Sequence, residues 1–595
     1  MRRNFSNTLL EVAVRDGHQV AKTEGVALRS EVATEVGTPR PSLKHVSSFS
    51  ALTDLASPQT KARARAARFV DVAPPRLQPE YRSHNQDVPV VIVTSEIAPW
   101  SRTGGLGLVA GSYSYEFPMR GHRTMVVTPM YDRYEGVECL GEISLFADGQ
   151  RHVKLWHRYM RCDDEKGCDL VFVEHPSFFR PGGIYTGDDG KEYDDNLMRF
   201  AILSLAALEA PLILSIGGST YGDKCVFLAN DWQSGLVPVY MCHKYRNNGV
   251  YLQARVIYVI HNLGYQGLYG PLSRFSPGAY LGLDDSATPD LYYNSLQGLV
   301  LNLTKGALLT TDRILTVSPN YAFEIQTPEG GFGLHEILKI RGNQLRLGGI
   351  LNGIDDSWDP SSDGQISANF SANDMSGRAV CRRELQRCLG LREDPSLVII
   401  GFVGRLTWQK GIDVLGSTAN WLMEDTGNGV TGQIQLIMMG HGERLHVEML
   451  RYMESTFRGR VCGYVGFDAK VERQMMAGCD LFVMPSRYEP CGLPQMYAQR
   501  YGALPVVTET GGLKDSVVCF RNDPSMATGF HIRPPLTRAT LMESLYEAAE
   551  LCLKWPEEFC RLQRNAMASN FYWPRAIDEY ERHIDYTLWD PATNR

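Results

Sequence analysis

Several features that mark particular classes of protein are missing from this sequence. No apolar run approaches the roughly 20 residues that a membrane-spanning helix needs. The 13 cysteines form no Cys-x-x-Cys pair, which argues against both a disulfide framework and a zinc cluster. Acidic residues outnumber basic ones, 67 to 60, so no overall positive charge attracts nucleic acid or an anionic membrane. We expect neither of them as a partner.

Two motifs for binding phosphate and metal are missing as well. There is no G-x-x-x-x-G-K-[ST] loop, which argues against ATP hydrolysis. No Asp-x-Asp pair stands where it could hold a divalent ion. The paired acids Asp188-Asp189, Asp284-Asp285 and Asp355-Asp356 are typical of turns. We therefore expect no metal site and no cofactor.

The first part of the chain differs in composition from the rest. Residues 1–85 are rich in Ser, Thr, Ala and Arg and have few aromatic residues. This composition predicts an extension, either a targeting segment that is removed or a disordered arm. The acids Glu11, Asp16 and Glu24 weigh against the targeting segment, and both interpretations stay open. No apolar segment continues beyond Leu10, which argues against a secretory signal.

From Val88 onward, short apolar, β-branched runs alternate with helical patterns. Such alternation predicts parallel sheets that helices cover on both faces, and these sheets bind ligands at the carboxyl ends of their strands. A chain of 595 residues is also too long for one core. We therefore predict an α/β fold with domains at residues 86–348 and 349–570, and a tail at 571–595 that crosses back to the first domain. The predicted strands are residues 90–93, 256–260, 313–317, 398–403, 434–439, 481–484 and 504–507.

Two glycine-rich turns, one in each half of the chain, predict where phosphate groups bind. They are Thr103-Gly104-Gly105-Leu106-Gly107 and Thr510-Gly511-Gly512-Leu513. Backbone N–H groups at a helix start can meet phosphates, because the helix end carries a partial positive charge. The carboxylate of Glu489, in Glu489-Pro490-Cys491-Gly492-Leu493, could hold the hydroxyls of a sugar. The pattern predicts a two-domain enzyme with its active site between the halves.

Polar residues that directly follow predicted strands are further candidates. Arg405 and Lys410 could clamp a diphosphate, or be a solvated basic pair. Asp231 could be catalytic or cap a helix, and His261 could contact a sugar or be structural. Phe467 could stack on a base or lie in the core. For Cys491 no base partner is identifiable, which favours a packing role over a thiol nucleophile.

With these motifs in place, residues 88–586 resemble glycosyltransferase family 5, the bacterial glycogen synthases and plant starch synthases. Stretches near His175 and Met198 look closest to the granule-bound starch synthases. The resemblance implies the GT-B fold, in which two Rossmann-like domains face each other across a deep cleft. It is carried by Ser101-Arg-Thr-Gly-Gly-Leu-Gly107, Asn230-Asp-Trp232, His261-Asn262, Tyr265-Gln-Gly267, Val317-Ser-Pro319, Gly404-Arg-Leu-Thr-Trp-Gln-Lys-Gly411, Pro485-Ser-Arg-Tyr-Glu-Pro-Cys-Gly-Leu493 and Thr510-Gly-Gly-Leu513.

The resemblance implies a retaining transfer of glucose from ADP-glucose or UDP-glucose to the non-reducing end of an α-1,4-glucan, without a metal. The expected partners are thus a nucleotide sugar and the glucan of a starch granule, in a plastid or, in lineages that store starch outside plastids, in the cytosol. The implied catalytic residues are His261, Asp231, Glu489, Arg405 and Lys410. The implied substrate-binding residues are Arg102, Thr103, Gly104, Gly105, Asn262, Tyr265, Gln266, Phe467, Cys491, Gly492, Leu493, Thr510, Gly511 and Gly512.

Two residues depart from the family pattern Lys-Thr-Gly-Gly-Leu-Gly-Asp-Val. Arg102 replaces the lysine, and Leu108 replaces the aspartate. Arg102 keeps the charge with a different geometry, and Leu108 removes a carboxylate, so we expect altered handling of donor or acceptor. These departures also keep open a starch-binding or scaffolding protein with weakened catalysis. Another GT-B sugar transferase, such as a sucrose synthase, is a third alternative that the Thr103–Gly107 turn disfavours.

Overall fold

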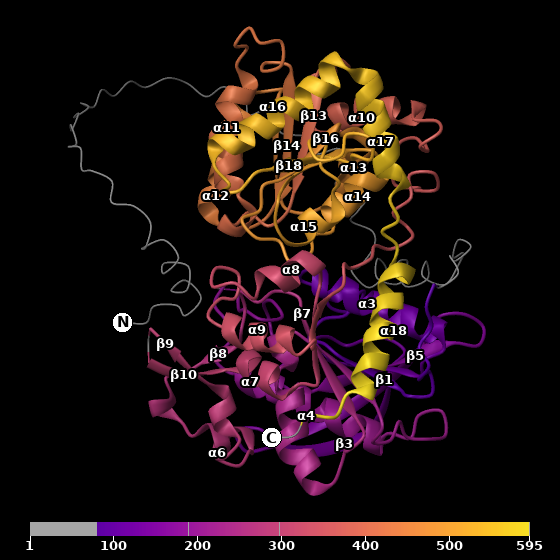
Figure 1. Ribbon diagram of the computed structural model, residues 1–595, viewed down its shortest axis with the longest axis vertical. Coiled ribbons are helices and arrows are strands. Elements are labelled where there is room, and N and C mark those ends of the chain that lie inside the picture. Colours follow the sequence, from indigo (N-terminus) through magenta and orange to yellow (C-terminus); the bar gives the residue numbers. More distant parts are fainter. Residues whose placement is uncertain (1–79, 189, 297, 594–595) are drawn as a thin grey trace, which may run out of the picture.

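The computed structural model describes residues 80–593 except 189 and 297, so most of the predicted extension lies outside the described residues. The chain forms two α/β domains, one above the other in Figure 1. All seven predicted strands are present, each within one residue of its predicted ends. The predicted fold class is therefore confirmed.

The N-terminal domain contains a nine-stranded sheet. Its strand order is β12-β11-β7-β6-β1-β2-β5-β4-β3, and the strands from β12 to β5 run parallel. The strands are β1 (Val90–Val93), β2 (Thr124–Pro129), β3 (Glu138–Phe146), β4 (Gln150–Arg161), β5 (Gly167–Glu174), β6 (Val226–Asn230), β7 (Arg255–Ile260), β11 (Arg313–Thr316) and β12 (Leu347–Gly349). The domain's helices are α3 (Gly105–Arg120), α4 (Asn196–Ile213), α5 (Leu236–Tyr240), α6 (Pro277–Leu281), α7 (Leu303–Thr310), α8 (Pro319–Glu324) and α9 (His335–Asn343).

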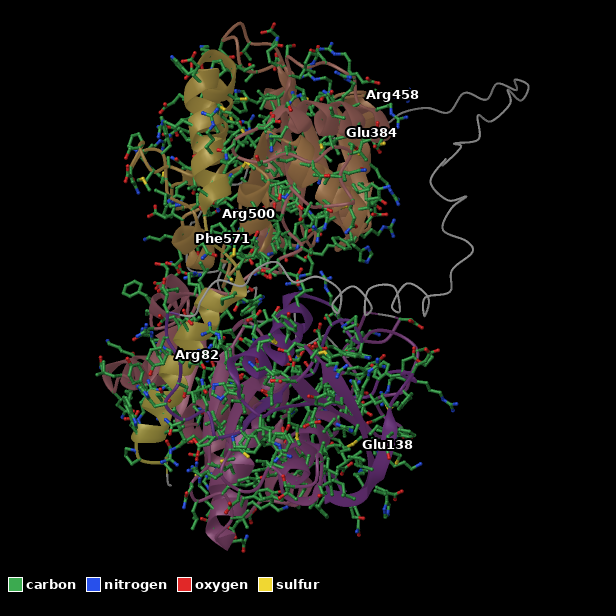
Figure 2. The ribbon with its side chains drawn as sticks, turned by 90° about the vertical axis from the view of Figure 1, so that its right-hand side faces the viewer. Arg82, Glu138, Glu384, Arg458, Arg500 and Phe571 are labelled. Carbon is green, nitrogen blue, oxygen red and sulfur yellow. The ribbon has the colours of Figure 1, made fainter. Side chains whose placement is uncertain are left out.

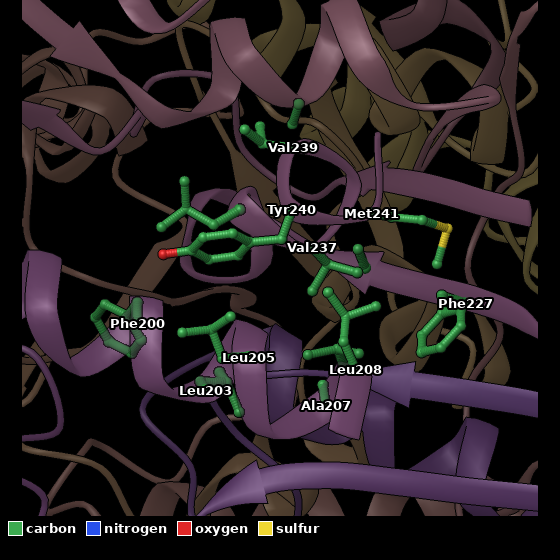
Figure 3. Close-up of a cluster of buried hydrophobic side chains, with 14 of the residues drawn as sticks. Phe200, Leu203, Leu205, Ala207, Leu208, Phe227, Val237, Val239, Tyr240 and Met241 are labelled. Atoms are coloured by element: carbon green, nitrogen blue, oxygen red, sulfur yellow. The ribbon is translucent and has the colours of Figure 1, made fainter. Parts of the chain in front are cut away.

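Alternate residues of β1 enter separate cores because successive side chains of a strand point to opposite faces. Val91 and Val93 join the core around α4, whereas Val90 and Ile92 join the core around α3. Figure 3 shows side chains of α4, among them Phe200 and Leu208, in the first of these cores. Burial on both faces explains why this strand is a continuous apolar run.

Helix α4 is more apolar than the sequence analysis recognised. Among the described residues it is the one helix whose length and composition would suit a membrane span. However, 83% of its 18-residue window is buried inside the protein. It is thus the central helix of the N-terminal core.

One edge of the N-terminal sheet departs from the predicted parallel arrangement. Strands β3 and β4 form an antiparallel hairpin that continues the sheet beyond β5, and most of β3 is exposed. The hairpin turns at Asp148 and Gly149, both with positive φ. An Asp-Gly pair is a strong hairpin signal, because both residues tolerate this left-handed backbone. A separate three-stranded antiparallel sheet consists of β8 (Leu268–Tyr269), β9 (Tyr292–Ser295) and β10 (Gly298–Asn302).

The C-terminal domain contains a six-stranded, fully parallel sheet in the order β15-β14-β13-β16-β17-β18. Two hydrophobic clusters lie on its opposite faces. The strands are β13 (Val398–Val403), β14 (Ile434–Gly440), β15 (Val461–Val465), β16 (Leu481–Met484), β17 (Leu504–Thr508) and β18 (Phe530–Ile532). The helices are α10 (Ser376–Cys388), α11 (Ile412–Met423), α12 (Arg444–Thr456), α13 (Ala469–Gly478), α14 (Pro494–Arg500), α15 (Gly511–Ser516), α16 (Arg538–Lys554) and α17 (Pro556–Ala568).

The last helix, α18 (Trp573–Trp589), lies against the N-terminal domain, where it contacts α3 and β7 (Figure 1). Figure 2 shows Phe571 at the level where the chain passes between the domains. Residues 81–85 also bind this helix, because the side chains of Tyr81 and Ser83 donate hydrogen bonds of 2.6 Å to Asp585. The start of the described chain thus packs on its last helix, which lies on the N-terminal domain.

We predict that Tyr580→Ala destabilises the N-terminal domain by about 3–5 kcal/mol, because it removes a fully buried ring from the contact between α18 and α3. Chemical denaturation measures the loss. The matched control is Tyr452→Ala, whose ring is 67% exposed on α12, and it should shift stability by less than about 0.5 kcal/mol. Equal effects of the two changes would contradict the assigned packing.

Candidate active site

The candidate residues lie at the carboxyl ends of parallel strands, as the fold requires of a ligand site. Asp231 follows β6 and His261 follows β7 in the N-terminal domain. Arg405 follows β13, and the loop that contains Glu489 follows β16, in the C-terminal domain. Loops from both domains contact one another here, because a guanidinium nitrogen of Arg405 lies 3.5 Å from the Tyr265 hydroxyl.

Asp231 is held in a strained conformation that aims its carboxylate at the next loop. Its φ is +56°, which is uncommon for a residue other than glycine. The carboxylate accepts hydrogen bonds from the backbone N–H groups of His261, at 2.7 Å, and Asn262, at 3.2 Å. It makes no capping hydrogen bond to the short helix that follows it. Burial raises the pKa of Asp231 to about 7, although these two hydrogen bonds oppose the shift.

His261 is a neutral imidazole. Burial lowers the pKa of His261 to about 3, so the ring carries no charge near neutral pH. Its Nε2 lies 2.9 Å from the side-chain oxygen of Asn230, while the side-chain nitrogen of Asn230 donates to Val93 and Leu228. An amide oxygen can only accept, so Nε2 carries the proton and Nδ1 keeps its lone pair.

Glu489 and Lys410 form an ion pair within the C-terminal half of the site. Glu489 is buried and also accepts a 3.0 Å hydrogen bond from Ser486. Removing one partner of such a pair would leave the other charge unpaired in a partly desolvated place, which is costly. The arrangement fixes the Glu489 carboxylate, and a bound anion would compete with it for Lys410.

The two glycine turns differ in what surrounds them. A Cβ atom on Gly104 or Gly105, at the start of α3, would meet nothing within 4 Å. A Cβ on Gly511 would lie 2.0 Å from the carbonyl oxygen of Glu489, and one on Gly512 would lie 2.3 Å from that of Cys491. The first turn therefore faces open space, whereas the second packs directly on the backbone of the Glu489 loop.

The hydrogen bonds of the second turn are also satisfied within the protein. The N–H of Gly511 donates to Glu324 at 2.9 Å, and that of Gly512 donates to the Glu489 carbonyl at 3.1 Å. The Thr510 hydroxyl lies 3.1 Å from both oxygens of Glu324. The expected role of these residues as phosphate contacts thus stays a prediction, and the geometry gives the glycines a packing role.

Sequence reasoning missed Glu96, which holds the first turn. This buried carboxylate accepts hydrogen bonds from the N–H and the hydroxyl of Thr103, both at 2.6 Å, and from Gly104 at 3.3 Å. The Tyr185 hydroxyl donates to the same carboxylate at 2.6 Å. Glu96 lies shortly after β1, so the rule that ligand sites lie at strand ends could have identified it.

Two of the predicted binding residues, Gln266 and Cys491, are buried. The Gln266 side chain is buried, with hydrogen bonds to Leu263, Phe332 and Asn302 at 2.6–3.2 Å. Cys491 is a buried free thiol, and burial raises its pKa to about 12, which excludes a thiolate near neutral pH.

The remaining predicted residues lie in loops at the site. Gly492 has a φ of +72°, and Leu493 directly precedes α14. Phe467, in the loop after β15, is 54% exposed, so its ring is available for stacking. Asn262 contacts the Tyr488 side chain, which brings the His261 loop against the Glu489 loop.

The two departures from the family pattern occupy different surroundings. Arg102 is exposed, and its charge acts on Glu472 of α13 in the other domain: burial raises the pKa of Glu472 to about 7, while Arg102 and Arg473 lower it. Leu108 is half-buried in the first turn of α3. The described residues contain no group of three or more His, Cys, Asp or Glu side chains placed to hold a metal ion.

Two α/β domains, with site loops at strand ends of both that contact one another, have the architecture of the GT-B glycosyltransferases. Residues 89–340 match the family described as the starch synthase catalytic domain, and residues 398–535 match glycosyl transferases group 1. The catalytic domain of starch synthase IV from Arabidopsis thaliana, solved bound to ADP and acarbose, superposes with a TM-score of 0.72 at 29% identity, covering 84% of this chain and all of that one. A sucrose-phosphate synthase from Thermosynechococcus elongatus, at 15% identity and a TM-score of 0.51, shares the fold.

Curated relatives of this chain are also starch synthases. Soluble starch synthase 1 of Solanum tuberosum is 40% identical over 531 residues, covering 84% of this chain and 79% of the relative. Granule-bound starch synthase 2 of the same plant is 38% identical, covering 83% of this chain and 63% of the relative. The chain belongs to the starch synthase family of glycosyltransferases, as its motifs predicted.

We predict that Gly511→Ala destabilises the protein much more than Gly104→Ala does. Gly511 combines a φ of +44° with the close Glu489 carbonyl, so alanine there should cost at least about 2 kcal/mol. Gly104 faces open space with an extended backbone, so alanine should change stability by less than about 0.5 kcal/mol. Thermal denaturation measures both, and a tolerated Gly511→Ala would contradict the packing role.

Asp231→Asn should stabilise the protein more at pH 8 than at pH 5. The pKa of Asp231 is about 7 in the folded state, above the roughly 3.9 of an unfolded aspartate. The folded state therefore binds the proton more tightly, and stability falls as pH rises between these values. Asparagine keeps the hydrogen-bond acceptor and removes the charge.

The melting temperature of Asp231→Asn, measured against wild type across this pH range, checks the prediction. Asp223→Asn is the control, since Asp223 is an exposed carboxylate just before β6. A stability difference between Asp231→Asn and wild type that does not change with pH would contradict the raised pKa.

Proposed function

We propose that the protein transfers glucose from ADP-glucose to the non-reducing end of an α-1,4-glucan with retention of anomeric configuration. The observation that supports this most is the contact of Arg405, from the C-terminal domain, with Tyr265, in the loop of His261. It brings the cations expected for the diphosphate next to the side chains expected for the sugar. ADP is favoured as the nucleotide because the starch synthase IV domain was solved with ADP and acarbose.

The donor diphosphate is proposed to bind Arg405, Lys410 and the open turn at Gly104 and Gly105. A guanidinium fork and an ammonium can neutralise charge on the leaving group, and backbone N–H groups at the start of α3 add to this. Lys410 would exchange its Glu489 partner for phosphate. The reaction is proposed to need no divalent metal, because these groups perform its task.

The sugar is proposed to lie between Asp231, His261 and Glu489. As the bond from the anomeric carbon to the phosphate oxygen breaks, the acceptor 4-hydroxyl forms the new glycosidic bond on the same face and its proton passes to the leaving phosphate. The neutral His261 can accept a hydrogen bond at Nδ1 from a sugar hydroxyl. Closure of the domains would exclude water and suppress hydrolysis of the donor.

A plastid location is proposed from the relatives, which are named chloroplastic/amyloplastic. Attachment to the starch granule is a finer proposal. It is supported by the similarity to granule-bound starch synthase 2, whereas the starch synthases 1 at 37–40% identity support a soluble enzyme. Centrifugation with washed granules separates these two possibilities.

The test is incorporation of labelled glucose from ADP-glucose and UDP-glucose, in parallel, into maltooligosaccharides, with and without EDTA. We expect transfer from ADP-glucose at least about tenfold faster than from UDP-glucose, and no effect of EDTA. Preference for UDP-glucose would contradict the proposed donor, and loss of activity in EDTA would contradict metal-free catalysis.

Two variants help to distinguish a glucosyltransferase of low activity from a scaffolding protein that transfers no glucose. Arg405→Ala removes a proposed phosphate contact and should lower kcat about a hundredfold or more. If the wild type transfers no glucose from either donor but binds glucan, the scaffolding alternative replaces our proposal. Leu108→Asp, which restores the family residue, then tests whether that position causes the loss.

A further inference from the structure

Helices α8 and α15 belong to different domains and face each other at the domain boundary in Figure 1. A backbone N–H group in the first turn of each helix donates a hydrogen bond to an acidic side chain of the other helix. Asp515 of α15 accepts a 2.7 Å hydrogen bond from the N–H of Asn320 in α8, and Glu324 of α8 accepts a 2.9 Å hydrogen bond from the N–H of Gly511 in α15. The pair is a reciprocal cap, since the first N–H groups of a helix have no partner within it and favour an anion.

The reciprocal cap is reinforced by side chains on both helices. The Asn320 side chain donates to Glu324 at 2.7 Å, so one residue binds both acids. The Thr510 hydroxyl lies 3.1 Å from each oxygen of Glu324. Glu324 thus joins the last turn of one helix to the start of the other.

Helix α8 also contacts both loops of the candidate active site. Its buried Tyr321 accepts a 3.0 Å hydrogen bond from the N–H of Leu263, two residues after His261. Ser318, which caps α8, donates a 2.6 Å hydrogen bond to the carbonyl of Pro490, next to Glu489. One short helix therefore lies between the loop of His261 and the loop of Glu489.

Helix α15 completes the connection from the other side. Its two glycines pack on the backbone from Glu489 to Cys491 so closely that neither has room for a Cβ atom. A shift of α15 would therefore move the Glu489 loop with it. The position of α15 relative to the N-terminal domain depends on the cap formed by Glu324 and Asp515.

We propose that Glu324 is a positioning residue that, with Asp515, fixes the Glu489 loop against the His261 loop by joining α8 to α15. The proposal rests on the function proposed above, because it makes the reciprocal cap a determinant of the rate of glucosyl transfer. Glu324 touches no substrate in this account. It acts through Thr510, Gly511 and the loop that they support.

The experiment compares Glu324→Ala, Glu324→Gln and Glu336→Ala. Glu336 is the matched control, because it is a 74% exposed carboxylate on α9 of the same domain. Hydrogen exchange of segments 486–493 and 507–516 reports the cap without turnover. The kcat and the donor KM report positioning.

We expect Glu324→Ala to speed exchange of both segments and to lower kcat about ten- to hundredfold, with the donor KM within about threefold of wild type. Glu324→Gln should restore most of the loss, because its side-chain oxygen still accepts from Gly511. Glu336→Ala should match wild type. Glu324→Ala with unchanged exchange and kcat would overturn the proposal, as would a Glu324→Gln variant that is equally impaired.

The experiment also covers two other cases, a Glu324→Ala variant that does not fold and a wild type that transfers no glucose. If Glu324→Ala does not fold, Asp515→Ala tests the other half of the cap by removing the acceptor for the Asn320 N–H, and unchanged exchange and kcat there would overturn the proposal. If wild type transfers no glucose, the proposed function fails, while faster exchange of the Glu489 segment in Glu324→Ala would still support the cap. Unchanged exchange in that case would overturn the cap itself.

Discussion

The active site depends on a constraint of parallel sheets: all their strands end at the same edge. Two such sheets, one in each domain, place Asp231 and His261 at one edge and Arg405 and Glu489 at another. The proposed phosphate-binding cations lie at the C-terminal edge, whereas the proposed sugar-binding residues are divided between the two edges. The contacts between the domains therefore decide the chemistry, and helices α8 and α15 supply many of them.

The site holds polar groups in conformations and protonation states that cost free energy of folding. Asp231 has a strained backbone and a pKa raised to about 7, and His261 is buried without charge. Such strain persists only where the surrounding structure enforces it, and it is common at functional sites. Stability gained by relieving it at Asp231 should come with lost activity.

Sequence patterns predicted seven strands well, because runs such as Val90–Val93 are buried on both faces and leave a continuous apolar signal. Other strands, such as β2, β5, β6, β15 and β18, were not predicted. The β3–β4 hairpin was missed although Asp148-Gly149 signals its turn. Arg405 and His261 were proposed from their place after predicted strands and Gly104 and Gly511 from their glycine-rich turns, whereas Tyr265 and Gln266 were implied by the family resemblance. The sequence could not show that Gly104 faces open space while Gly511 packs on Glu489, or that Glu324 binds Gly511, because each depends on a segment distant in the chain.

The most direct test of this account is a crystal structure with ADP and a maltooligosaccharide. We predict that the diphosphate lies within hydrogen-bonding distance of Arg405, Lys410 and the N–H group of Gly105, while Gly104 stays bound to Glu96 and Glu324 stays bound to Gly511. A diphosphate bound at the start of α15, with Glu324 displaced from Gly511, would contradict both the proposed donor site and the role of the reciprocal cap.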